Sequence, residues 1–406
     1  DTSGNIGSSS VTFTKNTTCN AVGGTITTYV NATGSNFTVH TFLANGNFNV
    51  TGICTVEYLV VGGGGGGGEN NGGGGGGGGG FRTGSTTVIA SDYTVTVGAG
   101  GAVKTSGSAS SAFNGAIAAA GGGNGASEVV NLAAGTGGSG GGGSRDGAMP
   151  GVAGNTPATT PAQGYAGGTT PVGGWGGGSG GGGANGVGLN GGGGSQNTEF
   201  AGDGGPGKAS SISGSEVYYA GGGGGNNAGQ AANPLGDSFL GNGGIGGGGN
   251  GGYRSTIGDG WTDAQSGTPN TGGGGGGGKM DNGHCAAGTG GSGIVIIRYL
   301  TPPDTTAPVV NITYPLNNTY YTINISVLNY TYSDVNPGSC WYSRDLGVTN
   351  STAVTAGVNF TSVTSVEGSN TWRVYCNDTS GNIGSSSVTF TKNTTSSSMW
   401  IKPLST

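Results

Sequence analysis

The feature that most constrains this chain is a glycine-rich body spanning residues 61–293. Thirteen of the 103 glycines lie outside it, which leaves 90 inside, and its longest runs are Gly62–Gly68, Gly72–Gly80, Gly221–Gly225 and Gly272–Gly278. Ordering a backbone takes roughly 1–2 kcal/mol per residue, whereas a hydrogen bond returns only about 0.5–1.5 kcal/mol net. The body is therefore either a flexible linker or a structure held by close lateral packing of backbones.

An ordered arrangement of bare glycine exists in the polyproline II conformation. It has three residues per turn and no internal hydrogen bonds, so its N–H and C=O groups point outward and can pair with neighbouring chains. Collagen is excluded because the body holds only seven prolines, too few for a triple helix. A parallel β-helix or silk-like sheet stays possible, although bare glycine is a poor strand former.

Apolar segments around and inside the body favour order. Val56–Val61 precedes it and Ile294–Leu300 follows it, and two such strands should pair and bring its ends together. Inside it, Phe113–Ile117 and Val217–Ala220 each come shortly before a glycine run. A flexible linker would not need these recurrences, so we expect a packed bundle.

Three motifs carry a family resemblance: Val56-Glu-Tyr-Leu-Val-Val-Gly-Gly-Gly-Gly, Tyr93-Thr-Val-Thr-Val-Gly-Ala-Gly-Gly101 and Gly293-Ile-Val-Ile-Ile-Arg-Tyr299. Over about residues 36–300 they resemble the glycine-rich domains of phage tail-fibre adhesins and large microbial surface proteins. The resemblance implies a bundle of polyglycine II helices.

Residues 19–60 predict a small β base for this body. Thr25–Val30 and Phe37–Leu43 read as strands, and Asn45–Gly46 is a hairpin signal before Phe48–Thr51. Alternation of side chains predicts that His40 lies on an open face of its strand. We expect the glycine-rich body to run from residue 61 to 300, closed by the strand at 294–300.

Residues 301–395 have a different texture, with short alternating strands after a proline-rich linker. The pattern Cys340-Trp341 … Trp372-Arg-Val-Tyr-Cys376 is typical of an Ig-like β-sandwich. The opening Asp304-Thr-Thr-Ala-Pro and the closing Asn377-Asp-Thr-Ser-Gly-Asn-Ile-Gly resemble Ig-like repeats of prokaryotic, notably archaeal, surface proteins. The predicted fold class is therefore all-β and non-regular, without substantial α-helix.

An internal repeat links the two ends of the chain. Residues 1–18 recur without change at 378–395, where they close the Ig-like unit. A single strand cannot bury its apolar face alone, so we interpret residues 1–18 as the terminal strand of a preceding Ig-like repeat or of another subunit. An accidental duplication is the alternative. Residues 396–406 are a tail or the start of a further module.

Composition excludes several classes of protein. The chain is 7% charged with a net charge of −6, which argues against nucleic-acid binding because that needs a basic face. No apolar run is long enough to span a membrane. No signal peptide is visible and the chain begins within a motif, so we expect a piece of a longer protein.

Five cysteines favour an oxidising compartment. We expect disulfides Cys340–Cys376 and Cys19–Cys54, with Cys285 unpaired or replacing one member of the second pair. Only one of the two histidines, His284, neighbours a cysteine, so no zinc spacing appears.

Asn-x-Ser/Thr sequons occur only outside the glycine-rich body, which fits a glycoprotein whose close-packed lattice excludes glycans. Chance in Asn- and Thr-rich strands is the alternative. The candidate sites are Asn16, Asn31, Asn36, Asn49, Asn311, Asn317, Asn324, Asn329, Asn350, Asn359, Asn377 and Asn393.

No catalytic, cofactor or metal site is predicted. Gly273–Lys279 imitates a phosphate-binding loop, but Met280 stands where Ser or Thr must bind magnesium. Asp378-x-Ser380-x-Asn382 resembles part of a calcium loop, yet lacks the following glycine and the distant glutamate, so a hairpin turn is the better reading. Two histidines are too few for a convincing catalytic set.

These observations predict a non-enzymatic extracellular protein. The preferred hypothesis is a structural subunit of a surface filament, in which Ig-like modules space rigid glycine-rich bodies and copies contact one another through residues 1–18. The alternative is a surface or phage-tail-like adhesin whose body presents loops to a glycan or receptor. Its aromatic residues would then recognise the ligand rather than cap the rods: Phe81, Tyr165, Trp175, Phe200, Tyr218, Tyr219, Phe239, Tyr253 and Trp261.

Overall fold

The chain, seen in a computed structural model, divides into two compact units, residues 1–301 and 302–406. The residues that the structure describes are 19–69, 72–128, 131–145, 149–171, 176–192, 200–227, 240–254, 261–279, 285–301 and 303–395. The described residues contain β-strands and no α-helix, so the predicted all-β class is confirmed. The expectations for residues 1–18 and 396–406 lie outside the described residues.

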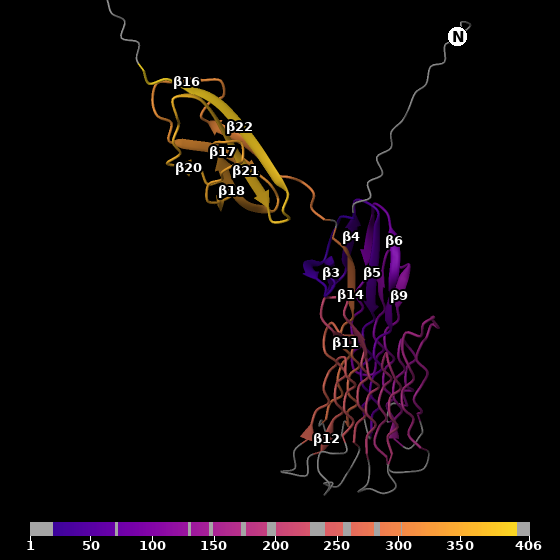
Figure 1. Ribbon diagram of the computed structural model, residues 1–406. Helices are drawn as coiled ribbons and strands as arrows, with labels where there is room; N and C mark the ends of the chain where they lie inside the picture. The colour runs from indigo at the N-terminus through magenta and orange to yellow at the C-terminus, as the bar shows by residue number, and fades with distance from the viewer. Residues whose placement is uncertain are drawn as a thin grey trace, which may run out of the picture. The chain divides into compact units, whose positions relative to one another are not determined.

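A five-stranded antiparallel sheet forms the base of the first unit (Figure 1). Its order is β2-β3-β14-β5-β6, with β2 at Thr25–Val30, β3 at Asn36–Phe42, β14 at Ile294–Leu300, β5 at Cys54–Val61 and β6 at Phe81–Val88. β14 pairs with β5 from Ile294↔Val61 to Arg298↔Glu57. The predicted pairing of the two apolar strands is confirmed, and it holds both ends of the glycine-rich body in one sheet.

The turn at Asn45–Gly46 does not make the expected hairpin. β4 (Gly46–Val50) lies in a separate sheet of order β1-β4-β7, between β1 (Ala21–Val22) and β7 (Ser91–Val95). The side-chain oxygen of Asn45 accepts a hydrogen bond from the N–H of Val97, at 2.8 Å. The turn therefore carries the chain from one sheet to another, because a partner distant in sequence competes for β4.

Both faces of the base sheet are covered. Val295, Ile297 and Tyr299 belong to a core shared with the small sheet, while Ile294 and Ile296 pack with Tyr219 and Ala220 of the glycine-rich body on the other side. A strand buried on both faces is apolar at every position, which explains the sequence Ile-Val-Ile-Ile. Three short hairpins complete the unit: β8 (Ser110–Ala112) with β9 (Ile117–Ala119), β10 (Lys208–Ser210) with β11 (Val217–Tyr219), and β12 (Tyr253–Arg254) with β13 (Trp261–Thr262).

The glycine runs continue from the base as extended rods lying side by side (Figure 1). In the rod 62–68 every third N–H donates to the same neighbour, at 2.8–3.0 Å. Gly62, Gly65 and Gly68 donate to Gly80, Gly77 and Gly74; Gly63 and Gly66 to Ser108 and Thr105; and Gly64 and Gly67 to Gly291 and Gly288. This period is that of polyglycine II, with three residues per turn and all bonds made sideways.

The carbonyls of the same rod follow the same rule toward other neighbours. Gly64 and Gly67 accept from Gly101 and Lys104, Gly63 and Gly66 from Gly122 and Gly125, and Gly65 and Gly68 from Gly275 and Gly278. The N–H groups of rod 62–68 and the carbonyls of Gly63–Gly68 are thus bonded to backbone on all sides. This is the order that the apolar segments at its borders predicted.

Close packing leaves no room for a Cβ atom at many glycine positions of the rods. A Cβ atom placed on Gly76 would lie 2.1 Å from the carbonyl oxygen of Gly65, and one on Gly65 would lie 2.1 Å from that of Gly123. Contacts below 3.0 Å with backbone cannot be relieved by rotating a side chain. Glycine is therefore required by the approach of the neighbouring backbone.

The second unit is a two-layered sandwich, called here the C-terminal sandwich (residues 303–395). One sheet has the order β15-β17-β20 and the other β16-β22-β21-β18-β19. The strands are β15 (Val309–Tyr314), β16 (Tyr320–Tyr321), β17 (Val327–Ser333), β18 (Pro337–Ser343), β19 (Val354–Thr355), β20 (Phe360–Thr361), β21 (Gly368–Asp378) and β22 (Ile383–Lys392). Both layers contribute to one core, which includes Leu328, Phe360, Trp372 and Phe390.

Candidate functional site

Hydrogen bonds between the rods occupy the backbone N–H groups that a phosphate-binding loop would need. A phosphate-binding loop needs free backbone N–H groups, but those of Gly274–Gly278 donate to carbonyls of neighbouring rods at 2.8–2.9 Å. Lys279, which ends this run, is buried. Residues 273–279 therefore serve as a structural rod, and no phosphate could reach their amides without breaking the lattice.

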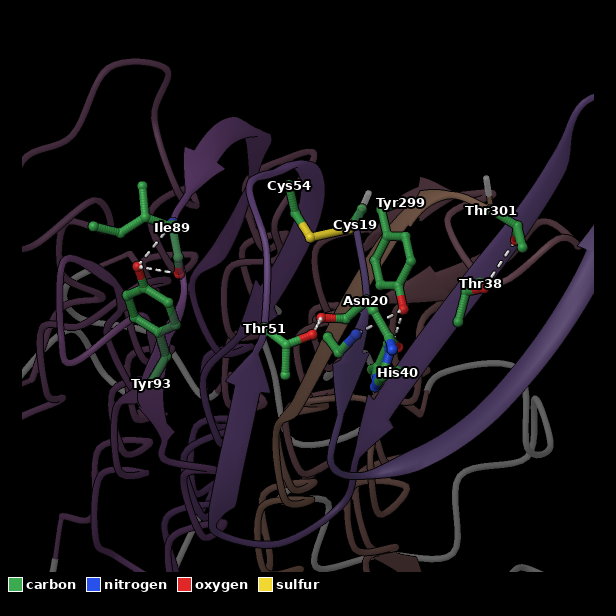
Figure 2. The surroundings of a disulfide bond; sticks show 11 residues. Cys19, Asn20, Thr38, His40, Thr51, Cys54, Ile89, Tyr93, Tyr299 and Thr301 are labelled. Carbon is green, nitrogen blue, oxygen red and sulfur yellow. Dashed lines mark hydrogen bonds between the residues drawn. A yellow bond between two sulfur atoms is a disulfide. The ribbon is translucent and has the colours of Figure 1, made fainter. Parts of the chain in front are cut away.

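A disulfide joins Cys19 to Cys54, the first residue of β5 (Figure 2). Next to it, Thr51 donates from its N–H to the carbonyl of Asn20 at 3.0 Å, and the N–H of Ala21 donates to the hydroxyl of Tyr299 at 3.3 Å. The segment that enters the base is thereby attached to β5 covalently and to β14 by a hydrogen bond.

His40 is fully buried, so the expected open face is wrong. Its ring lies between the rings of Phe48 and Tyr299. The distances between ring centroids are 5.0 Å to Phe48, which meets His40 edge-on, and 5.6 Å to Tyr299. Its Nδ1 lies 2.7 Å from the carbonyl oxygen of Gly23, which requires that this nitrogen carry the proton. Burial lowers the pKa of His40 below 6.5, opposed by this hydrogen bond. The small sheet closes this face, which alternation within one strand could not reveal.

The second disulfide, Cys340–Cys376, joins β18 to β21. The two cysteines are directly opposite in the register of adjacent strands, so the bond lies within one sheet. Antibody-type domains instead link their two sheets. The buried tryptophan also differs from that pattern, because Trp372 fills the core while Trp341 lies on the other side of its sheet.

Cys285 is free and buried, and therefore replaces neither partner of the Cys19–Cys54 bond. Burial raises the pKa of its thiol to about 11, assisted by the charge of Asp263. Its Sγ donates to the carbonyl of Tyr253 at 3.4 Å. Because the thiolate is the reactive form, this cysteine is a poor nucleophile at neutral pH. The neighbouring His284 lies outside the described residues.

Sequence reasoning missed a cluster of three carboxylates in the C-terminal sandwich. Oxygens of Asp304, Asp334 and Asp378 lie within 4.8 Å of one another. Asn382 donates from Nδ2 to Asp378 at 2.8 Å, and Asn336 donates likewise to Asp304 at 2.9 Å. This hydrogen bond is the main cause that lowers the pKa of Asp304. Oxygen ligands of this kind suit calcium, but here an amide N–H group already donates to each of the three carboxylates.

The segment Asp378–Asn382 itself is a hairpin turn between β21 and β22, as its sequence favoured. Asp378 is buried, and its second oxygen accepts a bond from the N–H of Asn382 at 2.8 Å. The signal for the cluster was present in the sequence, since Asp304 opens the unit and Asp378 closes it. Only the fold brings the two ends together.

None of the sequon asparagines in the described residues is buried. Asn36, Asn311, Asn317, Asn324, Asn350, Asn359 and Asn393 are exposed, and Asn31, Asn49, Asn329 and Asn377 are half-buried. Asn16 lies outside the described residues. The accessibility that glycosylation requires is thus present, and occupancy stays a prediction.

One of three comparisons with known proteins identifies the family of the glycine-rich part. The described parts of the chain contain no helix that could cross a bilayer. Searches among curated proteins and among solved structures found no match. A family model described as a glycine-rich domain matches residues 41–300, from β3 through the rods to β14. The chain therefore belongs to the glycine-rich domain family.

Proposed function

We propose that this protein is a structural, non-enzymatic subunit of an extracellular filament, in which sandwich modules link rigid glycine-rich bodies. The two disulfides support a location outside the reducing cytoplasm. The rods support stiffness, because their backbone groups bond to neighbouring rods rather than to water. The resemblance of the C-terminal sandwich to archaeal Ig-like surface repeats supports the role of a spacer.

The observation that carries the proposal is the placement of the repeated segment in the C-terminal sandwich. Residues 383–392 form β22, which pairs with β21 from Gly368↔Lys392 to Asn377↔Ile383. On its other edge β22 runs parallel to β16. The side chains of Val388 and Phe390 are buried, and the ring of Phe390 meets Trp372 edge-on at 4.9 Å.

Residues 1–18 have the same sequence as 378–395, so Val11 and Phe13 match Val388 and Phe390. A segment with identical side chains can make identical contacts in the same strand position, between β21 and β16. We infer that residues 1–18 supply the last strand of the sandwich of another copy, whether in a tandem chain or in a separate subunit. Successive copies would then be joined by a strand that belongs to both.

A chain that ends at Asn377 tests this arrangement. It contains one full repeat, with a donor strand at its start and a sandwich that lacks β22 at its end. We expect it to form linear polymers whose length grows with concentration, seen by light scattering and electron microscopy. The chain of residues 1–406, whose sandwich is complete, should stay monomeric under the same conditions.

Two controls make the result specific. Phe13→Asp places a charge where the ring of the donor strand should be buried, and should abolish polymerisation without touching the sandwich. A peptide of residues 378–395 should cap the open sandwiches and shorten the polymers. A chain ending at Asn377 that remains monomeric at every concentration would contradict the filament.

The second candidate is an adhesin, favoured by exposed aromatic side chains on the glycine-rich body. Tyr165 and Phe200 are each 43% exposed, and aromatic rings on a rigid support can stack on sugars or receptor side chains. Tyr219 and Phe81, in contrast, are buried at the base and cap the rods. Monomeric behaviour of the chain ending at Asn377, together with binding to a glycan array that Tyr165→Ser and Phe200→Ser abolish, would favour this role.

A further inference from the structure

The hairpin between β2 and β3 holds a sequon in an unusually fixed geometry. Its turn spans Asn31 to Ser35, closed by a bond from the N–H of Asn31 to the carbonyl of Ser35 at 2.9 Å. A second bond runs from the N–H of Gly34 to the carbonyl of Asn31 at 3.0 Å, and Gly34 adopts a positive φ of 83°, which favours glycine. The sequon Asn31-Ala32-Thr33 therefore lies in an exposed, ordered turn.

The side-chain amide of Asn31 has a fixed orientation. Its Oδ1 accepts three hydrogen bonds, from the N–H of Thr33 at 3.1 Å, the hydroxyl of Thr33 at 2.9 Å and the N–H of Ser35 at 2.8 Å. Because the amide is planar, Nδ2 points away from these donors. In the neighbouring sequon the hydroxyl of Thr38 is instead engaged with Thr301, at 2.8 Å, so Asn36 has no such support.

A cavity of about 290 Å³ begins at Asn31, between the hairpin and the turn at Ser211–Gly214. Tyr29 and Phe37 line it as a stacked pair with ring centroids 5.4 Å apart. Arg298 forms another wall, with its guanidinium 4.8 Å from the centre of the Phe37 ring. The lining of the cavity thus combines two aromatic rings, a cation and the sequon residue Asn31.

The wall is rigid, because Arg298 is held on several sides. It donates to Glu57 at 2.9 and 2.6 Å, to the carbonyl of Ser211 at 3.1 Å and to the hydroxyl of Tyr29. Gly214 packs on the Tyr29 ring so closely that a Cβ there would lie 2.9 Å from it. The cavity is therefore pre-formed, so binding does not require the protein to lose further conformational freedom.

We propose that Asn31 is N-glycosylated and that its first sugar occupies this cavity. A hexosamine has one apolar face of C–H groups, which can pack against carbon atoms of Tyr29 and Phe37, and hydroxyl and acetamide groups, which suit Arg298 and the carbonyl of Ser211. The covalent link attaches the sugar to a residue that lines the cavity, so a site too small for tight binding of a free sugar suffices. This inference rests on the secreted location proposed above.

The modification needs a diphosphate-linked glycosyl donor and a transferase of the secretory route. The Nδ2 of Asn31 attacks the anomeric carbon, forming a C–N bond while the C–O bond to the diphosphate breaks. The diphosphate leaves with the electron pair, and the amide loses one proton to the transferase. No oxidant or reductant is required.

The test uses the full chain secreted from a glycosylating eukaryotic host and trimmed enzymatically to one N-acetylglucosamine per site. Peptide mass spectrometry should find Asn31 occupied. Thr33→Ala, which destroys the sequon, should lower the Tm of the first unit by about 2 °C. In a Tyr29→Val background, where the ring is gone, Thr33→Ala should have no such effect.

Two controls isolate the sugar. The same variants made in a non-glycosylating host measure what the lost hydroxyl of Thr33 contributes by itself. Thr352→Ala removes the exposed sequon at Asn350, which has no aromatic partner, and should leave the Tm of the C-terminal sandwich unchanged.

Two results would overturn the proposal. One is an unmodified Asn31 in preparations where Asn350 is modified. The other is a Thr33→Ala effect that persists in the Tyr29→Val background, since the sugar would then not contact the ring. Polymerisation of the chain ending at Asn377 is measured on unglycosylated protein, so the filament proposal stands or falls separately.

Discussion

The two units form their buried interiors in opposite ways, one from large side chains and the other from glycine backbone. The C-terminal sandwich buries side chains such as Trp372 and Phe390 between two sheets, whereas the rods bury glycine and bond their backbone groups to neighbouring segments on all sides. In the sandwich, a change of side-chain volume decides stability. In the rods, the addition of a side chain at a close-packed glycine position decides stability.

The difference teaches where each unit tolerates variation. A sandwich core accepts hydrophobic substitutions that conserve volume. The rods have no such latitude, because the neighbouring atom is a backbone carbonyl that cannot change rotamer. The base sheet belongs to both regimes, since its apolar strands hold the two ends of the glycine-rich body.

The largest effect is expected from Gly76→Ala in the rods. The added Cβ would meet backbone atoms of Gly65 at 2.1 and 2.6 Å, so the lattice must open, and we expect a loss of more than about 4 kcal/mol in the free energy of unfolding. Gly46→Ala is the control, because its nearest neighbour is a Phe42 ring atom at 3.4 Å, and it should change stability by less than about 1 kcal/mol. Thermal unfolding measures both. Equal effects would show that the rods are looser than their hydrogen bonds indicate.

Trp372→Ala tests the sandwich in the same way. Removal of a fully buried indole should destabilise this unit by about 3–5 kcal/mol, and the unfolding transition of the first unit should not move. Trp341→Ala, which removes a half-exposed ring stacked on Tyr375 at 5.9 Å, should cost about 0.5–1.5 kcal/mol. Calorimetry resolves the two transitions. A shift of both transitions would contradict the division into independent units.

The smallest effect is a difference in acid sensitivity. Burial lowers the pKa of His40 below 6.5, so the unfolded chain binds a proton more readily than the folded one. Stability of the first unit should therefore be complete above pH 6.5 and fall as the pH drops below it.

The C-terminal sandwich has no histidine and should behave differently. Hydrogen bonds, first from Ser343, lower the pKa of Asp345 to about 2 from 3.8, so its contribution is lost only below about pH 4. Comparing Tm at pH 5 and 7.5 measures the contrast. His40→Gln should flatten the response of the first unit, and an unchanged slope in that variant would assign it to other groups.

Sequence patterns correctly predicted the features that depend on short segments of the chain. The apolar runs of β5 and β14 indicated their pairing, and cysteine spacing indicated both bridges that the structure contains. The turn at Asn45–Gly46 and the environment of His40 were misjudged because each depends on a second sheet. Local sequence could not specify which strands would form it.

The neighbours of each rod were beyond prediction for another reason. Glycine runs are chemically alike, so nothing in Gly62–Gly68 distinguishes Gly291 from any other acceptor. The connecting segments and the base decide which rod lies beside which. Likewise, the cavity at Asn31 depends on Ser211 and Arg298, which are far from the sequon in the sequence.

The three-residue bonding period of rod 62–68 constrains how such a rod can evolve. Inserting or deleting one residue would rotate all following residues of the rod by a third of a turn, so that each N–H group would face the wrong neighbouring segment. Changes by multiples of three would lengthen or shorten the rod and leave its pairing intact. We therefore expect the lengths of glycine tracts in this architecture to change by multiples of three amino acids.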